Sequence, residues 1–393
     1  MAEAPASCPV CNAKGMFPIY NSDTATSLSS LCQILPGSKI ISYCENCGHL
    51  AANGVADSAA FYETDYRILL DEEDEDQIYQ VRGDEIITRT DHQMTVLTGK
   101  IPLDSVHKIL DFGCAKAAMA RKITEAKTGI DMHLFDVSRM YEPFWDKFVS
   151  KDRQAINQIP DDWNGKFDLV TSFFAFEHIT EPAAAIAHVA QLLKPGGQFY
   201  MIVPDVTGNA ADFIVVDHVN HFTRPSAERL MADAGFGEIE VDTQSHRGAL
   251  IVTGRKDAAA IDETDSAAAK AHVLAHAREL AEFWSKAAAT VRANEAASPP
   301  DAKVAIYGSG FYGAFIQANL ERPEATACFL DRSPWRQGRM LFDVPIIASA
   351  DMPEGITTVY AGLNPMIAHD VIRAQPWAKR HDLRIVYLKE PGK

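Results

Sequence analysis

Apolar runs alternate with helix-like stretches between about residues 104 and 255, and this alternation constrains the fold more than any other feature. Strands that alternate with helices are typical of a mainly parallel sheet with helices on its faces. The runs expected to form strands are Lys108–Phe112, Met132–Asp136, Gln154–Gln158, Phe167–Phe173, Gln198–Val203, Glu238–Asp242 and Ala249–Thr253. Helices are expected at Pro182–Leu193 and Ser226–Ala234, and a further one at Gln77–Leu97 leads into the sheet.

The same alternation returns after residue 301, beyond an alanine-rich stretch that reads as a helical connector. We therefore expect an α/β protein with four parts: an amino-terminal module at 1–95, a central Rossmann-like domain at 96–256, a connector at 257–300 and a carboxy-terminal Rossmann-like domain at 301–393.

Two Cys-x-x-Cys pairs lie near the start of the chain, Cys8 with Cys11 and Cys44 with Cys47. Each pair at this spacing can supply two thiolates to one Zn²⁺, and two pairs complete a tetrahedral shell. Gly48 follows the second pair and lets the backbone turn around the metal. The alternative interpretation is redox or disulfide chemistry, but nothing in the sequence indicates secretion. The pairs thus predict a structural zinc site in the amino-terminal module.

The net charge of −16 argues against nucleic acid as a partner, because phosphate contacts need a basic surface. The amino terminus shows no signal-peptide pattern, and no apolar run approaches the length of a membrane span. Four of the seven cysteines are assigned to metal, which leaves an odd number of thiols and fits a reducing compartment. We expect a cytoplasmic protein that binds neither a membrane nor nucleic acid.

The turns after the first two predicted strands carry residues suited to a nucleotide-like ligand. Asp111 and Gly113 close the first strand, and Gly113 lets the backbone approach a ligand closely. Asp136 ends the second strand, where a carboxylate can accept hydrogen bonds from ribose hydroxyls. Two acid–histidine dipeptides follow, Glu177-His178 after the fourth strand and Asp217-His218 before a helix. A histidine beside an acid is suited to proton transfer near neutral pH.

These motifs, with the run Phe167-Asp-Leu-Val170 and the turn Leu192-Leu-Lys-Pro-Gly-Gly197, resemble the class I S-adenosylmethionine-dependent methyltransferases over about residues 105–255. The resemblance implies S-adenosylmethionine as cofactor. It assigns Asp111 to the cofactor site, Gly113 and Cys114 to the methionine part, Asp136 to the ribose, and Phe173 and Phe174 to the walls below the sulfonium. The glycine loop of the family is reduced here to Gly113 followed by Cys-Ala-Lys-Ala117.

The three-part layout further resembles the zinc-containing sugar C-methyltransferases of deoxysugar pathways. This resemblance implies a nucleotide-linked keto-sugar as substrate, whose carbon beside the ketone is deprotonated and then methylated. It makes His218 the base with Asp217 as its partner, and it has His178 with Tyr62 or Tyr66 hold the ketone oxygen. It also assigns substrate contacts to Glu177 and His221. The family has Glu where this chain has Asp217, and usually Tyr where it has His221.

A complete G-x-G-x-x-G runs from Gly308 to Gly313 after the predicted strand 303–307, and Asp331 ends the next strand. Taken alone, this motif indicates a bound NAD. The resemblance instead implies a domain that keeps the fold without NAD and frames the substrate cleft, with Gly308, Gly310, Phe311 and Tyr312 near the substrate. Two other functions stay open: methyl transfer to oxygen or nitrogen of another small metabolite, and an NAD-dependent oxidoreductase or scaffold that uses the last domain.

Overall fold

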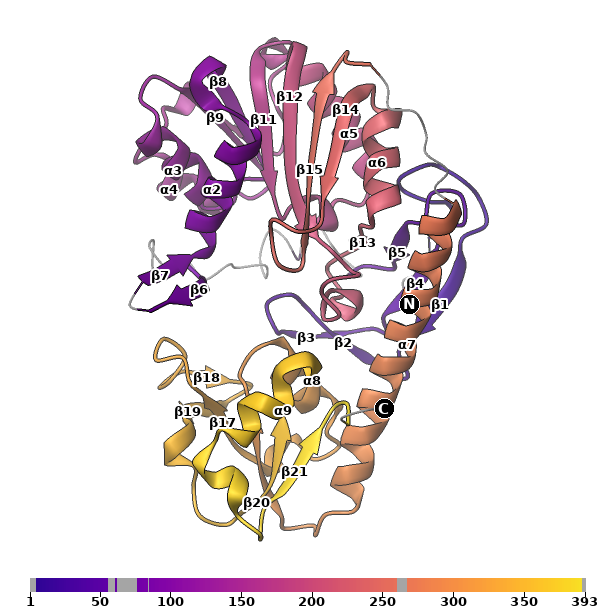
Figure 1. The fold of residues 1–393 in the computed structure, drawn as a ribbon, viewed down its shortest axis with the longest axis vertical. Helices are drawn as coiled ribbons and strands as arrows, with labels where there is room; N and C mark the ends of the chain where they lie inside the picture. Colours follow the sequence, from indigo (N-terminus) through magenta and orange to yellow (C-terminus); the bar gives the residue numbers. More distant parts are fainter. Residues whose placement is uncertain (1–4, 56–60, 62–75, 84, 260–266, 391–393) are drawn as a thin grey trace.

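The computed structural model describes residues 5–55, 61, 76–83, 85–259 and 267–390. Tyr62 and Tyr66, which were predicted to contact the substrate, lie outside the described residues. Three larger sheets follow one another through the molecule (Figure 1). The seven-stranded sheet occupies the upper part of the view, a four-stranded amino-terminal sheet lies at its side, and a six-stranded sheet forms the lower part.

The central sheet has the strand order β10-β9-β8-β11-β12-β15-β14. Its strands are β8 (Lys108–Phe112), β9 (Asp131–Asp136), β10 (Gln154–Ile156), β11 (Phe167–Phe173), β12 (Leu193–Pro204), β14 (Phe236–Asp242) and β15 (Ala249–Lys256). The first five run parallel, and β15 is antiparallel to both of its neighbours. From β8, successive strands are added toward one edge of the sheet as far as β10, and the chain then returns to place β11 on the other side of β8. The carboxyl ends of β8 and β11 therefore form the switch point where α/β sheets bind ligands.

Helices cover both faces of this sheet, and this explains the apolar runs. They include α2 (Arg89–Lys100), α3 (Ala118–Ala126), α4 (Glu142–Trp145), α5 (Pro182–Leu192) and α6 (Arg224–Asp233). Neighbouring residues of β8, Ile109 and Leu110, are both fully buried and belong to different apolar clusters. A strand buried on both faces needs continuous rather than alternating apolar residues. The predicted strands Lys108–Phe112 and Phe167–Phe173 are confirmed with their bounds.

The helix predicted at Gln77–Leu97 is wrong in its first part. A hairpin of β6 (Ile78–Arg82) and β7 (Glu85–Thr88) stands there, and α2 begins only at Arg89. Gly83 makes the hairpin turn at φ 60°, and Thr88 starts the helix through a capping box with Asp91. A reciprocal cap of this kind fixes a helix start more firmly than the propensity of the residues before it.

The amino-terminal sheet takes its last strand from the central part of the chain. Its order is β1 (Phe17–Asn21), β4 (Ile40–Tyr43), β5 (Leu50–Ala52) and β13 (Asn220–His221). In β13, Asn220 pairs with Ala51 and His221 pairs with Leu50. A second hairpin, β2 (Thr26–Leu28) with β3 (Ile34–Pro36), lies between the upper and lower parts in Figure 1. The segment around Asp217-His218 is thus tied to the amino-terminal module by backbone hydrogen bonds.

The long helix α7 (Ala267–Ala296) runs along one side of the molecule, from the amino-terminal sheet to the last sheet (Figure 1). That sheet has the order β18-β19-β17-β16-β20-β21, and only β18 is antiparallel to its neighbour. Its strands are β16 (Lys303–Tyr307), β17 (Thr326–Asp331), β18 (Met340–Leu341), β19 (Val344–Ala348), β20 (Ile356–Ala361) and β21 (Arg384–Tyr387), and its helices are α8 (Phe311–Asn319) and α9 (Pro365–Arg373).

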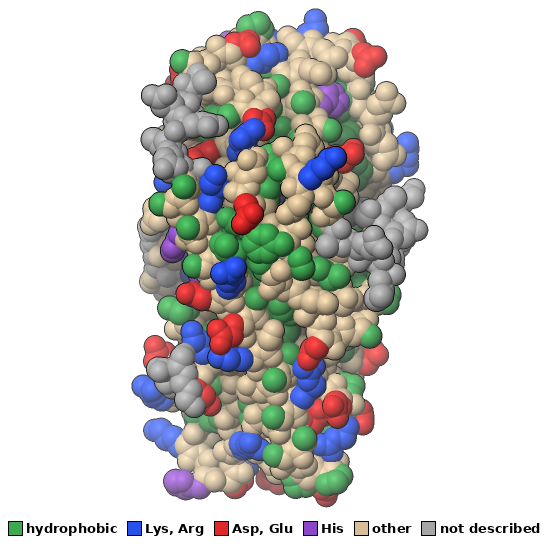
Figure 2. Space-filling view, turned by 90° about the vertical axis from the view of Figure 1, so that its right-hand side faces the viewer, with side chains coloured by type: hydrophobic (Ala, Val, Ile, Leu, Met, Phe, Trp, Pro, Cys, Tyr) green, Lys and Arg blue, Asp and Glu red, His purple; other side chains and the backbone are tan. Residues whose placement is uncertain are grey.

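The distribution of surface charge and the character of the helices are relevant to the predicted absence of nucleic-acid and membrane partners. Figure 2 shows basic and acidic side chains interspersed over the face that it views, without a large area of one sign. Among the described residues, we find no helix that combines the length and the apolar character needed to cross a bilayer.

Candidate active site and metal centre

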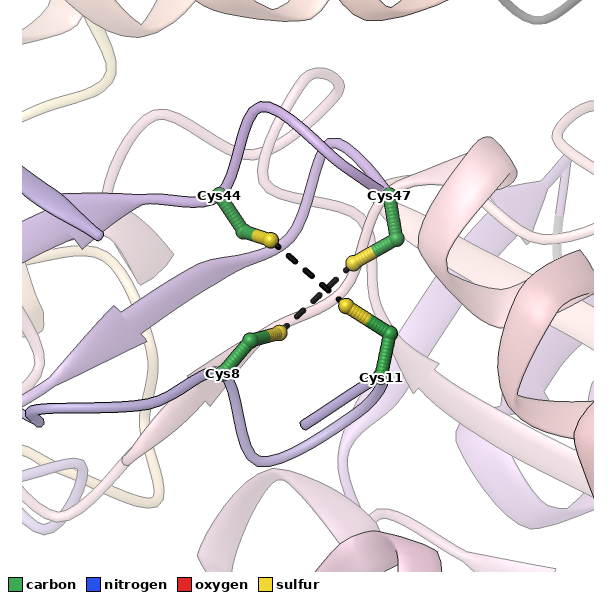
Figure 3. A group of neighbouring side chains, drawn as sticks. All are labelled: Cys8, Cys11, Cys44 and Cys47. Carbon is green, nitrogen blue, oxygen red and sulfur yellow. Dashed lines mark hydrogen bonds between the residues drawn. The ribbon is translucent and has the colours of Figure 1, made fainter. Parts of the chain in front are cut away.

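The four cysteines of the two pairs converge on one point, as predicted. Figure 3 shows their sulfur atoms turned toward a common centre from two facing loops. The Sγ atoms of Cys8 and Cys47 lie 3.6 Å apart, as do those of Cys11 and Cys44. These separations are far above the roughly 2.05 Å of a disulfide. They match the edge of about 3.8 Å expected for a tetrahedron with Zn–S bonds of about 2.3 Å.

The two loops turn in the way that a thiolate pair around a metal requires. Gly48 has φ 74°, and Asn12 takes the equivalent place after the first pair with φ 58°. The amide of Asn12 donates to the carbonyl of Cys8, and the amide of Gly48 donates to that of Cys44. The donor set and its geometry fit zinc.

Gly113 and Asp136, which were predicted to contact the cofactor, lie at the carboxyl ends of the neighbouring strands β8 and β9. Gly113 has φ 74°, and a Cβ there would lie 2.6 Å from the Cβ of Ala175, so only glycine fits this turn. The Asp136 carboxylate accepts hydrogen bonds from the amides of Ala115, at 2.8 Å, and Ser138, at 2.9 Å. Each oxygen carries a second lone pair, so both can still accept a ribose hydroxyl. The free lone pairs of Asp136 and the tight turn at Gly113 are compatible with their predicted places beside the ribose and the methionine part of S-adenosylmethionine, which remain predictions.

The residues that replace the family's glycines adopt a glycine-like backbone. Ala115 has φ 45° and Ala117 has φ 58°, both in the left-handed region that disfavours side chains. The amide of Ala115 donates to Asp136, and its carbonyl accepts from the indole nitrogen of Trp145. Hydrogen bonds on both sides of one residue hold this loop in shape despite the missing glycines.

The other residues assigned to the cofactor lie around the same edge. Asp111 is buried and accepts from the hydroxyl of Thr171, and burial raises the pKa of its carboxyl to about 7. Phe173 is partly buried against Tyr200. Phe174 has φ 55°, which is rare for an aromatic residue, and the guanidinium of Arg89 lies over its ring at 3.9 Å. Burial also raises the pKa of the Cys114 thiol.

The two predicted histidines meet beside the carboxyl end of β11. His178 closes a short 3-10 helix (Phe176–His178), and His218 lies in the segment before β13. Their ring centroids are 4.8 Å apart in an edge-on arrangement. The structure therefore brings together His178 and His218, which are forty residues apart in the chain, while their predicted roles remain predictions.

The structure corrects the predicted partner of His218. Its Nδ1 lies 2.5 Å from one carboxylate oxygen of Asp212, and the other oxygen of Asp212 lies 2.8 Å from Nδ1 of His221. The Asp217 carboxylate accepts instead from the amide and hydroxyl of Ser30, at 2.7 and 2.6 Å. Asp217 lies in the turn before β13, and its carboxylate is directed to the amino-terminal module through Ser30.

Asp212, Ser30 and Lys39 were not predicted. Lys39 is buried and donates to the carbonyls of Val215 and His218, at 2.6 and 2.9 Å. None of these three residues belongs to a recognised sequence motif. Asp212 lies only six residues before His218, and this short separation is the one feature of the sequence that could have suggested the pair. His221 was expected to contact the substrate, but it is fully buried and holds the second oxygen of Asp212.

Burial and neighbouring charges shift the pKa values of His218 and His178 in opposite directions. Burial disfavours a charged His218, but its hydrogen bond with Asp212 and the negative charges of Asp212, Asp217 and Glu177 outweigh burial and raise the pKa of His218. Burial and the neighbouring His218 lower the pKa of His178 to about 4. Burial raises the pKa of Glu177, which is 1% exposed, to about 7. Titrating groups whose pKa values are pushed apart are typical of proton-transfer sites.

The G-x-G-x-x-G turn of the last sheet is explained by backbone packing. A Cβ at Gly308 would lie 2.4 Å from the carbonyl oxygen of Gly362, and one at Gly313 would lie 1.9 Å from that of Gly308. Asp331, where an acid would meet a ribose, accepts from the amide and hydroxyl of Ser309.

The two aromatic residues within this motif pack against Trp284 of α7. Tyr312 stacks on Trp284 with ring centroids 5.6 Å apart, and Phe311 approaches the same indole edge-on. A Cβ at Gly310 would lie 3.9 Å from Nη1 of Arg336, which is an ordinary van der Waals contact. The predicted substrate contacts of Gly308, Gly310, Phe311 and Tyr312 remain predictions.

Comparison with known proteins agrees with this reading of the central part. Residues 88–241 match the family model of a methyltransferase domain. A ubiquinone biosynthesis O-methyltransferase of Nitrosococcus oceani is 30% identical over 114 residues, which cover 28% of this chain and 48% of that protein. One from Alkalilimnicola ehrlichii is 34% identical over 96 residues, which cover 23% and 38%. The chain spans about half or less of the length of the curated relatives it matches.

Among solved structures, an S-adenosylmethionine-dependent methyltransferase from Mesorhizobium loti aligns with a TM-score of 0.35 at 17% identity and covers 42% of this chain and 98% of that one. The family match and the strand order define the class of the central part. Residues 88–241 are a class I S-adenosylmethionine-dependent methyltransferase domain with an α/β Rossmann-like fold.

Proposed function

We propose that the chain methylates a carbon atom of a nucleotide-activated keto-sugar. The observation that carries this proposal is the Asp212–His218 pair beside His178, at the sheet edge where the methyltransferase domain meets the amino-terminal module. An imidazole that is oriented by a carboxylate and has a raised pKa is suited to remove a proton from carbon beside a ketone. The layout with a cysteine cluster in front and a second α/β sheet behind supports the sugar as acceptor.

The residues of the chain would act as follows. His218 accepts the proton from the carbon beside the ketone, and Asp212 holds its ring and stabilises the imidazolium. His178 donates its Nδ1 proton to the carbonyl oxygen of Asp217, and its neutral ring keeps a lone pair on Nε2. This nitrogen would therefore accept a hydrogen bond from a hydroxyl of the sugar rather than donate one to the enolate oxygen. S-adenosylmethionine, when bound, supplies an electrophilic methyl group, and Gly113 and Asp136 would hold it. We include a zinc ion at the cysteine cluster in the proposal.

Deuterium exchange and methyl transfer together test this function. We expect purified protein to exchange the proton beside the ketone of a nucleotide-linked keto-sugar with deuterium, and to transfer labelled methyl to the same carbon. His218→Gln should keep S-adenosylmethionine binding and lose both reactions by at least about a hundredfold. Exchange that persists in His218→Gln would exclude His218 as the base.

Methyl transfer to oxygen of a small metabolite is the second candidate. The curated relatives that match the central domain are named O-methyltransferases, and this observation favours it. It requires no acidic C–H bond in the acceptor. Methylation at oxygen, with no deuterium exchange at any carbon of the acceptor, would select this candidate over the first.

A further inference from the structure

Three side chains with metal-ligating atoms converge in the candidate active site. Glu177, His178 and His218 each offer one donor atom, and these atoms lie within 4.8 Å of one another. Glu177 is 1% exposed, and its Oε2 has no hydrogen-bond partner among the described residues. A buried carboxylate oxygen without a partner is costly, and an absent ion is one of the few explanations.

Both histidines are held in the manner of metal ligands. Nδ1 of His218 is bonded to the Asp212 carboxylate, and Nδ1 of His178 lies 3.0 Å from the carbonyl oxygen of Asp217. Histidine ligands usually donate one ring N–H to a carboxylate or a backbone carbonyl, which orients the other nitrogen toward the metal. Here, Nε2 of each ring is that other nitrogen.

The charge around the cluster favours a cation. The carboxylates of Glu177, Asp212 and Asp217 are each at most 1% exposed, and all three surround the two imidazoles. The ammonium of Lys39 reaches this segment through the carbonyls of Val215 and His218 rather than through a carboxylate. Buried carboxylates favour positive charge among them, which Lys39, a protonated His218 or a bound cation can supply.

We propose that Glu177, His178 and His218 bind one divalent transition-metal cation, distinct from the ion at the cysteine cluster. Two imidazoles and one carboxylate suit Zn²⁺ and leave a position open for an exogenous ligand. Tetrahedral bonds of about 2.1 Å place donors about 3.4 Å apart, so donor atoms that lie within 4.8 Å of one another need to close by at most about 1.4 Å.

The cation and the proposed proton transfer exclude one another. A metal on Nε2 of His218 occupies the lone pair that would accept the substrate proton. This step rests on the proposed function, whereas the binding site itself does not. We therefore infer that the cation-loaded protein is the inhibited form for carbon deprotonation.

Metal counting and calorimetry test the site. The full chain, with zinc already at its cysteine cluster, is titrated with Zn²⁺, and we expect one further equivalent to bind. Glu177→Gln and His178→Gln should each weaken this second site at least tenfold, and Asp212→Asn should weaken it about 10- to 100-fold through the orientation of His218. Glu181→Gln, an exposed glutamate four residues away, is the matched control and should bind as the wild type does.

The outcomes separate the two proposals. Binding of S-adenosylhomocysteine verifies that each variant is folded, and a variant that fails this check is replaced by the other ligand variant. No second equivalent in the wild type, or an unchanged affinity in both folded ligand variants, overturns the metal site. If the second ion binds but no keto-sugar is ever methylated, the proposed function fails while the metal site stands.

Discussion

One carboxylate organises the candidate site at the scale of single residues. Asp212 divides its two oxygens between His218 and His221, so each imidazole has a fixed orientation and each oxygen of the carboxylate has a hydrogen-bond partner. Asp217, the neighbour of His218 in sequence, instead binds the backbone and hydroxyl of Ser30. The histidine predicted as the base is thus positioned by a residue from the preceding turn, and its sequence neighbour connects the site to the amino-terminal module.

A histidine away from this site makes the stability of the domain depend on pH. His133 on β9 is 4% exposed and packs edge-on against the rings of Trp163 and Phe167. Burial, with the charges of Lys108 and Arg153, lowers its pKa to about 4, while Asp131 at 3.3 Å opposes the shift.

The sign of the effect follows from the two protonation states. His133 is neutral in the folded protein, whereas the unfolded chain binds a proton below about pH 6.5. Its contribution to stability is therefore complete above pH 6.5 and is lost as the pH falls toward 4. His133→Phe removes this contribution, so between pH 7 and 4.5 the wild type should lose about 2–3 kcal/mol more than the variant. Urea unfolding at both pH values measures this, and equal losses would contradict it.

At the scale of elements, α7 is the connector that joins the parts of the chain. Its Trp284 donates to the carbonyl of Ala210 and stacks on Tyr312 of α8, so one residue contacts both the segment before the histidine site and a helix of the carboxy-terminal part. Near the end of the helix, the buried carboxylate of Glu295 accepts from the amides of Glu321 and Arg322, at 2.7 and 2.8 Å.

The attachment of α7 to the last sheet depends on this carboxylate. Glu295→Ala leaves two amide donors without partners, and we expect it to destabilise the protein by about 2–4 kcal/mol. Glu295→Gln keeps one acceptor and should cost about half as much. Glu282→Ala, an exposed position of the same helix that pairs only with Lys286 in the described part of the chain, should change stability by less than about 0.5 kcal/mol. Denaturant unfolding of the three variants decides whether the carboxylate has this role.

At the scale of the whole molecule, the cysteine cluster and the histidine site belong to one connected structure. The loop of Cys44 and Cys47 leads into β5, which pairs with β13, and β13 begins two residues after His218. The methyl donor is expected on the other side, at Gly113 and Asp136. Loss of metal at the cluster should therefore disturb the acceptor side and spare the donor side.

Removal of zinc tests this division. In Cys44→Ser, or after chelation, we expect at least a tenfold loss of turnover and a lower melting temperature, because binding of a structural zinc is coupled to folding. The affinity for S-adenosylmethionine should change by less than about threefold. Cys32→Ser, which lies outside the cluster, is the control and should behave as the wild type does. An equal loss of S-adenosylmethionine affinity would show that the module supports the whole fold rather than the acceptor side.

The sequence by itself determined what short windows encode. Continuous apolar runs defined β8 and β11, because strands between two helical layers are buried on both faces. The spacing of the cysteines predicted a shared centre, and Gly113 stands at a turn that no side chain fits. The hairpin before α2 escaped prediction, because a capping box and one glycine turn outweighed the propensity of the surrounding residues.

Only the tertiary structure decided how distant residues pair. The contact of Ser30 with Asp217 joins residues 187 positions apart, and the register of β13 on β5 places His221 beneath Asp212. Such pairings follow from strand register and from the packing of one module on another. Neither can be predicted from the pattern of residues within a short stretch of sequence. The histidines could be named from the sequence, but their partners, burial and protonation exist only once the two sheets have come together.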